Sequence, residues 1–148
     1  MGTCCPAMEI GSPALPVVVL IVEDEPFTRF MAADVLSRSG LAVREALCAD
    51  EALTILEAQA DVRAVFTDVE MPGSLDGLAL ARQIGERWPS IGVVVTSAFP
   101  RYADKVPERC GFLSKPYSGP ELIRQIREVT MPAGSSDTKL AERFSARR

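Results

Sequence analysis

The chain has 148 residues, of which 47% are apolar and 24% charged, and its formal net charge at pH 7 is −4. This length is typical of one globular domain, and the composition argues against a disordered or fibrous protein. The sequence contains no histidine. The absence of histidine excludes Ser-His-Asp and Cys-His hydrolases, histidine-bearing zinc sites and any phosphohistidine chemistry on this chain.

The charge is unevenly distributed. Residues 132–148 hold four basic and two acidic side chains, a balance of +2, so residues 1–131 carry −6. An acidic body is unsuited to a nucleic-acid surface and suited to holding a cation. We therefore expect no nucleic-acid partner.

The four cysteines form no CxxC pair, which argues against zinc and thioredoxin-like redox sites. The longest apolar run, residues 17–22, is too short to cross a membrane, and the N-terminus lacks the basic flank of a secretory signal. We expect a cytoplasmic protein with no membrane partner. Proline, glycine and the absence of periodicity predict a flexible lead-in over residues 1–16, a folded domain over 17–131 and a flexible basic tail over 132–148.

Short apolar runs alternate with helical patterns along the folded domain. The runs that predict strands are residues 17–22, 41–47, 64–67, 91–96 and 112–113. The first, VVVLIV, is apolar throughout and β-branched, as in a strand covered on both faces. Five strands with helices between them predict a parallel sheet with right-handed crossovers.

Four helices are predicted between and after these strands. The first begins near Pro26 and ends at Gly40, and its apolar stripe is expected to be Phe27, Phe30, Met31 and Val35. The second and third have apolar stripes over residues 52–60 and 80–88. The last begins at a capping box formed by Ser118 and Glu121.

Polar side chains follow four of the predicted strands. Glu23 and Asp24 end the first strand, Asp68 ends the third, Thr96 ends the fourth, and Lys115 comes directly after the fifth. Because the carboxyl ends of parallel strands lie along one edge, where ligand sites open, these side chains are expected to share one crevice.

Carboxylates about 4 Å apart repel by about 4 kcal/mol per pair at an effective dielectric constant of about 20, so a proton or a cation must intervene. With oxygen ligands and no histidine, Mg²⁺ is the cation that fits best. One carboxylate would then accept a phosphoryl group, the Lys115 ammonium would neutralise its charge, and the Thr96 hydroxyl would donate to its oxygen.

Four strings carry a resemblance to a known family: VVVLIVEDEP, FTDVEMPGSLDGL, VVVTSA and FLSKPY. In order and spacing they resemble the receiver domain of bacterial two-component response regulators, over residues 17–130. The resemblance implies an α/β, flavodoxin-like (βα)5 three-layer fold with a parallel sheet in the order 2-1-3-4-5. It also implies phosphotransfer to an aspartate from a histidine kinase or a histidine phosphotransfer protein, in a single-domain regulator that acts on an unknown downstream protein or as a phosphate sink.

The resemblance also implies roles for individual residues. Asp68 would be the phosphoacceptor and a ligand of Mg²⁺, with Asp24 as a direct ligand and Glu23 acting through water. The main-chain carbonyl of Glu70 would complete the metal site. Thr96 and Lys115 would contact the phosphoryl group, and Phe112 would be the aromatic residue that changes rotamer with Thr96. Lys115-Pro116 would be a cis peptide, and no organic cofactor is implied.

The chain departs from the family pattern in the segment FPRYADKVPERC, residues 99–110. This segment is about one turn short for the family's fourth helix and contains Pro107, which removes a helical hydrogen bond. We therefore predict a short or irregular fourth helix, and a monomer or weak dimer in place of the dimer that the family builds on this helix. Glu23 stands where many members have aspartate, and the loop after Asp68 is one residue longer.

The resemblance implies a phosphoacceptor that phosphorylates and dephosphorylates itself but is not a turnover enzyme, and two other functions compete with it. A haloacid-dehalogenase-like phosphatase also uses Asp, Mg²⁺, Ser/Thr and Lys, but it needs a second Asp two residues after the nucleophile, where this chain has Glu70. A pseudo-receiver that serves only as a docking module would not need the acidic set with Thr96 and Lys115.

Overall fold

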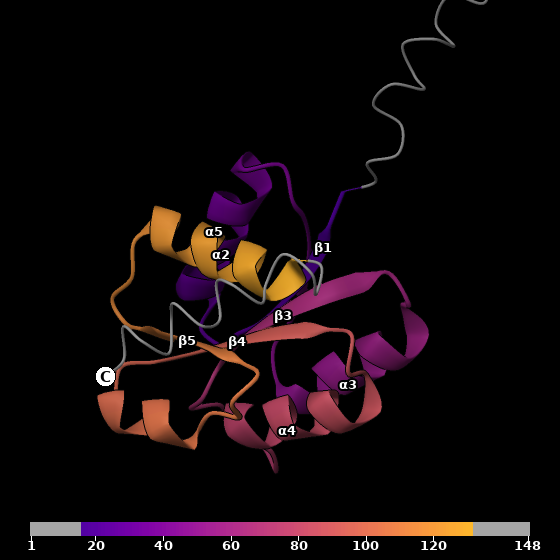
Figure 1. Ribbon diagram of the computed structural model, residues 1–148, viewed down its shortest axis with the longest axis vertical. Helices are drawn as coiled ribbons and strands as arrows, with labels where there is room; N and C mark the ends of the chain where they lie inside the picture. The colour runs from indigo at the N-terminus through magenta and orange to yellow at the C-terminus, as the bar shows by residue number, and fades with distance from the viewer. Residues whose placement is uncertain (1–15, 132–148) are drawn as a thin grey trace, which may run out of the picture.

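The computed structural model describes residues 16–131, so the predicted tail and all but the last residue of the predicted lead-in lie outside the described residues. The described residues form a five-stranded parallel sheet in the order β2-β1-β3-β4-β5 (Figure 1). The predicted strand order is confirmed. The strands are β1 (Val18–Val22), β2 (Ala42–Ala46), β3 (Val62–Asp68), β4 (Gly92–Ser97) and β5 (Gly111–Ser114).

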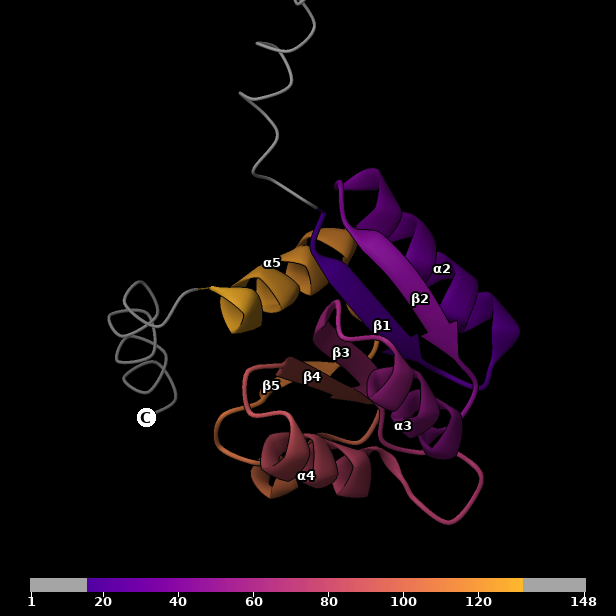
Figure 2. The ribbon, with the colours of Figure 1, turned by 90° about the vertical axis from the view of Figure 1, so that its right-hand side faces the viewer.

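Helices cover both faces of the sheet. They are α2 (Pro26–Arg38), α3 (Ala49–Ala58), α4 (Gly77–Arg87) and α5 (Gly119–Thr130). Figures 1 and 2 show α2 and α5 on one face and α3 and α4 on the other. Each face has its own apolar core, one centred on residues such as Leu80 and Ile84 and the other on Leu36 and Ile126. This is the three-layer arrangement that the sequence predicted.

The register of the strands places the predicted site residues along one edge. Asp68, the last residue of β3, pairs with Thr96 of β4, and Val22, the last residue of β1, pairs with Thr67. Glu23 and Asp24 therefore follow β1 beside the end of β3. The central strands β1 and β3 are almost completely buried, as the continuous apolar sequence of β1 predicts.

The segment between β4 and β5 forms a short 3-10 helix, η1 (Pro100–Lys105), in place of an α-helix. Pro107 lies just beyond it and contributes its carbonyl, which accepts a hydrogen bond from the amide of Cys110. The prediction of a short or irregular fourth helix is confirmed. The rings of Phe99 and Tyr102 meet edge to face, and the Arg101 guanidinium lies over both.

The predicted apolar stripe of α2 is wrong, although the helix itself is confirmed. Phe27, Phe30 and Met31 are 68%, 62% and 46% exposed, whereas Ala32 and Leu36 are the buried residues of this helix. Val35 alone of the predicted stripe packs against a core. The inner face of α2 thus carries Ala32 and Leu36, and the bulky Phe27, Phe30 and Met31 point outward.

Two predicted local features at the start of α5 are present. The peptide between Lys115 and Pro116 is cis. The side chain of Ser118 accepts a hydrogen bond from the Glu121 amide, and the Glu121 side chain accepts one from the Ser118 amide. This reciprocal capping fixes where α5 begins relative to the end of β5.

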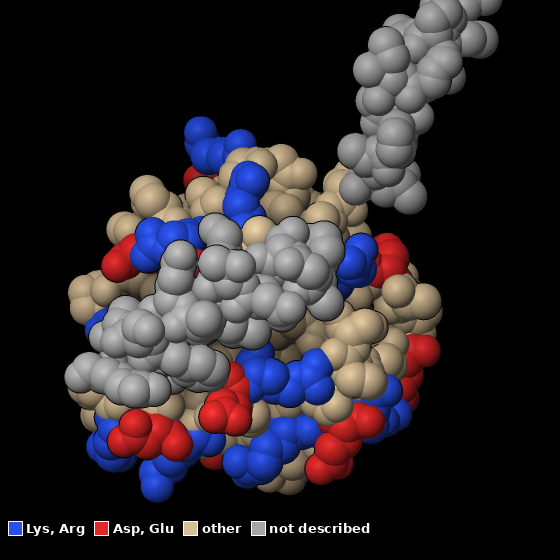
Figure 3. Space-filling model, viewed as in Figure 1, with Lys and Arg blue, Asp and Glu red and all other residues tan. Residues whose placement is uncertain are grey.

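Among the described residues, no helix is long and apolar enough to cross a membrane. On the face that Figure 3 shows, basic and acidic side chains are intermixed rather than gathered into a surface of one sign. Three of the acidic side chains pair with arginines in exposed salt bridges, namely Arg38–Asp34, Arg44–Asp61 and Arg87–Glu57. Exposed pairs of this kind contribute little to stability.

Candidate functional site

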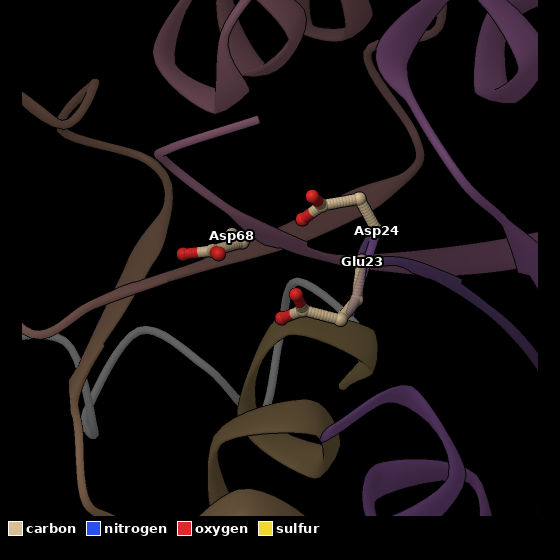
Figure 4. A group of neighbouring side chains, drawn as sticks. All are labelled: Glu23, Asp24 and Asp68. Atoms are coloured by element: carbon tan, nitrogen blue, oxygen red, sulfur yellow. The ribbon is translucent and has the colours of Figure 1, made fainter. Parts of the chain in front are cut away.

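Three carboxylates meet at the edge of the sheet where β1 and β3 end. Glu23, Asp24 and Asp68 each present an oxygen within 4.8 Å of the others. Figure 4 shows the three carboxyl groups around a common space, two from the end of β1 and one from β3. Glu23 and Asp68 are each only 6% exposed, whereas Asp24 is open to solvent. The predicted convergence of these residues, far apart in the sequence, is therefore observed.

The ammonium group of Lys115 joins this cluster from the end of β5. Its Nζ lies 3.3 Å from Asp68 Oδ2 and 3.6 Å from Glu23 Oε1. The Lys115 amide donates to the carbonyl of Ser97, which ties the residue after β5 to the end of β4. One positive charge thus faces two buried carboxylates, and the cluster has a net negative charge when all its groups are ionised.

Burial raises the pKa of Asp68 above its ordinary value. The neighbouring Lys115 lowers it through its charge and its hydrogen bond, and the Glu70 carboxylate raises it. The pKa of Glu23 is raised too, again mainly by burial, against the lowering effect of the hydrogen bond from the Glu25 amide. In both acids the effect of burial on the pKa outweighs the lowering effect of the Lys115 charge.

The donor atoms of this cluster fit Mg²⁺. Asp68 Oδ1 is buried and has no hydrogen-bond partner among the described residues, so it is available as a ligand atom in this group of three carboxylates. All the available ligands are oxygen atoms, which Mg²⁺ prefers. Asp24 and Glu70 also line an open hollow of about 460 Å³ through which solvent reaches the cluster. Glu70 follows β3 in this hollow, and the role of its carbonyl as a ligand stays a prediction.

Thr96 lies at the edge beside Asp68 but its hydroxyl is turned toward β5. Thr96 Oγ1 donates to the main-chain carbonyl of Leu113 at 2.7 Å and is almost completely buried. To donate to a phosphoryl oxygen on Asp68, this hydroxyl would have to leave the carbonyl. Phe112, the residue before Leu113, is partly buried against the core on the α3–α4 face.

One contact at the site was not predicted from the sequence. The Ser97 hydroxyl, fully buried, donates to the Glu70 carboxylate at 3.0 Å and accepts a hydrogen bond from the Phe99 amide at 3.0 Å. Ser97 therefore links the loop after β3 to the loop after β4. The sequence offers only a weak signal for it, since serine after a strand is common at turns.

Comparison with known proteins gives one family. The family model "Response regulator receiver domain" matches residues 19–127. The response regulator MprA of Mycolicibacterium vanbaalenii is 30% identical over 142 residues, which is 88% of this chain and 59% of MprA. An uncharacterised 14.6 kDa protein of Leptolyngbya boryana is 32% identical over 119 residues, covering 76% of this chain and 89% of the relative. This chain thus spans little more than half the length of MprA.

Solved structures agree with the sequence comparison. The receiver domain of NtrX from Brucella abortus has a TM-score of 0.68 and 33% identity, over 76% of this chain and 97% of that domain.

Proposed function

Since this chain belongs to the response regulator receiver domain family, we propose that it accepts a phosphoryl group on Asp68 in a Mg²⁺-dependent reaction. The observation that carries the proposal is the buried, unpartnered Oδ1 of Asp68 amid three carboxylates and one lysine. We propose a histidine kinase or a histidine phosphotransfer protein as the donor, and no enzymatic turnover of other substrates.

Each residue of the cluster has a part in this reaction. A carboxylate oxygen of Asp68 forms a bond to phosphorus as the phosphorus–nitrogen bond of the donor's phosphohistidine breaks, and the electron pair leaves with the imidazole. Asp24, Asp68 and the Glu70 carbonyl are the groups that would hold Mg²⁺, with Glu23 in support. When bound, Mg²⁺ supplies positive charge that offsets the developing charge on the phosphoryl oxygens.

Lys115 and Thr96 would stabilise the product. The ammonium of Lys115 already contacts Asp68 Oδ2 and would remain beside the phosphoryl group. The Thr96 hydroxyl would exchange the Leu113 carbonyl for a phosphoryl oxygen, and this exchange would loosen a bond between β4 and β5. Phe112 is adjacent to Leu113, and we propose that its side chain changes rotamer when the Thr96 hydroxyl moves.

An apolar groove beside the site supports a protein donor. The groove, about 470 Å³, is lined by Phe27 and Met31 of α2, by Ala98 after β4 and by Lys115 and Tyr117. Large exposed apolar patches mark interaction surfaces. Because Lys115 lines the groove and also contacts Asp68, a protein seated there lies next to the phosphoacceptor. We propose the phosphohistidine donor as its occupant.

Phosphorylation by acetyl phosphate tests the assignment. Incubated with acetyl phosphate and Mg²⁺, the protein is expected to gain the mass of one phosphoryl group, and peptide mapping should place it on Asp68. Removal of Mg²⁺ by a chelator, or the substitution Asp68→Asn, should abolish the labelling. Labelling of Asp68→Asn at the wild-type level would contradict the proposal.

A second arm of the same assay tests the groove. Replacing Phe27 with Ser should slow transfer from a histidine-phosphorylated donor about tenfold or more, since buried aromatic anchors dominate interfaces. Labelling by acetyl phosphate, which needs no docking, should be unchanged. Equal loss in both assays would assign the effect to the phosphoacceptor itself, and no loss with the protein donor would exclude the groove as its docking site.

The phosphatase alternative has less support. Glu70 stands where that class needs an aspartate, and its carboxylate accepts a hydrogen bond from the Ser97 hydroxyl. Sustained hydrolysis of p-nitrophenyl phosphate would revive it. A docking-only pseudo-receiver would show neither labelling nor Mg²⁺ binding.

A further inference from the structure

Arg29 lies one turn into α2 and reaches back to the loop that carries Glu23 and Asp24. Its Nη1 donates to the main-chain carbonyl of Glu23 at 3.0 Å, and its Nε pairs with Glu45 Oε1 at 3.0 Å. The Arg29 side chain is only 18% exposed. A guanidinium that is mostly buried and bonded at two edges is held in one geometry.

The carbonyl that Arg29 holds belongs to the peptide between the two acidic residues. Because a peptide unit is planar, fixing the Glu23 carbonyl also fixes the amide of Asp24 and the direction in which Asp24 leaves the strand. The Glu23 amide is separately bonded to the Ala46 carbonyl at 3.1 Å, and Glu23 Oε2 accepts the Glu25 amide at 3.1 Å. Arg29 thus supplies the bond that orients the Glu23–Asp24 peptide.

The charge of Arg29 needs compensation in this position. A guanidinium bonded to the carbonyl of Glu23 would repel a divalent cation bound by the neighbouring carboxylates. Glu45 lies on the edge strand β2, opposite Ile21 of β1, and its carboxylate pairs with this guanidinium. The pKa of the Glu25 carboxyl group is lowered, mainly by its hydrogen bonds with Thr28 and to a smaller extent by the charge of Arg29.

We infer that the Arg29–Glu45 pair positions the metal site: Arg29 orients the Glu23–Asp24 peptide, and Glu45 neutralises the guanidinium beside the cation. Neither residue is among the carboxylates that would hold Mg²⁺, so both are positioning residues and not ligands. The inference rests on the proposed function, because it concerns the metal that Asp68 needs. Mutation of residues that hydrogen-bond to metal ligands, without binding the metal themselves, commonly lowers metal affinity by about 10- to 100-fold.

Isothermal titration of the full chain with Mg²⁺ tests this inference. We expect Arg29→Met to raise the Kd for Mg²⁺ about tenfold. Glu45→Gln should raise it as well, and more strongly at low ionic strength, because an unpaired guanidinium is then less screened. Arg29→Lys keeps the charge, but an ammonium group cannot reproduce the two guanidinium hydrogen bonds to Glu23 and Glu45. This variant should therefore also bind Mg²⁺ more weakly than the wild type.

Arg44→Met is the matched control. Arg44 neighbours Glu45 on β2, pairs with Asp61 at 2.8 Å and points to the opposite face of the strand. It should leave the Kd for Mg²⁺ unchanged. Thermal unfolding without metal measures any general loss of stability in both arginine variants, and a purely structural role for Arg29 would lower the Tm without changing the Kd.

The outcomes separate this inference from the proposed function. Wild-type affinity in Arg29→Lys and Glu45→Gln overturns the inference, even where Arg29→Met fails to fold, and leaves phosphoacceptance by Asp68 intact. The inference is likewise overturned if Arg44→Met weakens Mg²⁺ binding as much as Arg29→Met does. A wild-type protein that binds no Mg²⁺ overturns both. Weaker binding confined to the Arg29 and Glu45 variants supports the positioning role.

Discussion

At the scale of single residues, the ionised form of the buried Asp68 carboxyl group is disfavoured in the metal-free protein. Its pKa is raised by burial and by the nearby Glu70, although Lys115 acts against both. A carboxyl whose pKa is higher in the folded than in the unfolded state binds more protons when folded. Between the ordinary pKa near 3.8 and the raised value, stability therefore falls as pH rises.

Asp68→Asn should remove this unfavourable buried charge. Without metal at pH 7, we expect the variant to unfold at a higher temperature than the wild type, because the ionised carboxylate is gone. The difference should shrink as the pH is lowered through the raised pKa of Asp68 and vanish below the ordinary carboxyl range, where Asp68 is protonated in both states. Asp104→Asn, at an exposed position in η1, serves as the control. A less stable Asp68→Asn at pH 7 would contradict this electrostatic explanation.

Most of the cluster could be predicted from residue positions alone. Glu23, Asp24, Asp68 and Lys115 each follow a strand, and parallel strands bring those positions together whatever the details of packing. The direction of the Thr96 hydroxyl could not be predicted, because the choice between Asp68 and the Leu113 carbonyl depends on neighbours from another strand. The contact between Ser97 and Glu70 depends on loop conformation in the same way.

At the scale of elements, helix α4 begins directly against β3, the strand that ends at Asp68. The Gly77 amide donates to the Val69 carbonyl at 2.9 Å, and a Cβ atom at Gly77 would collide with the main-chain oxygen of Asp68. Later in the same helix, Gly85 has more room, since the nearest atom to an added Cβ is at 3.8 Å on the Arg109 side chain. A side chain is therefore excluded sterically at Gly77 but not at Gly85.

Gly77→Ala should destabilise the protein by about 1–3 kcal/mol, as overpacking in a close contact does, and should reduce labelling of Asp68 because β3 must shift. Gly85→Ala should be neutral or stabilise by up to about 1 kcal/mol, since alanine is the better residue inside a helix. Urea unfolding of both variants measures the difference. Equal stability of the two variants would show that the approach of α4 to Asp68 is not constrained by Gly77.

The elements themselves were largely predictable, and the one wrong prediction concerns the buried face of α2. Pro107 correctly indicated that no full helix forms between β4 and β5. In α2, apolar residues occur around the whole helix, so the spacing of Phe27, Phe30 and Met31 was as regular as that of Ala32 and Leu36. The structure buries Ala32 and Leu36, and the even distribution of apolar residues around α2 does not indicate which face faces the core.

At the scale of the whole molecule, two cores of apolar side chains hold the sheet rigidly between its helices. The carboxylates of Glu23, Asp24 and Asp68 meet where β1 and β3 of this sheet end. A cation bound there would join the ends of β1 and β3. Because it would bind the folded chain and not the unfolded one, it would add about 2.7 kcal/mol of stability at a hundred times its Kd.

The most direct test of the proposed metal site is a crystal structure of the full chain grown with Mn²⁺ in place of Mg²⁺, with the metal located by its anomalous scattering. We predict one peak within bonding distance of the Asp24 and Asp68 carboxylates. No peak at these carboxylates under saturating metal, or a peak bound only elsewhere on the molecule, would contradict a metal-dependent phosphoacceptor at Asp68.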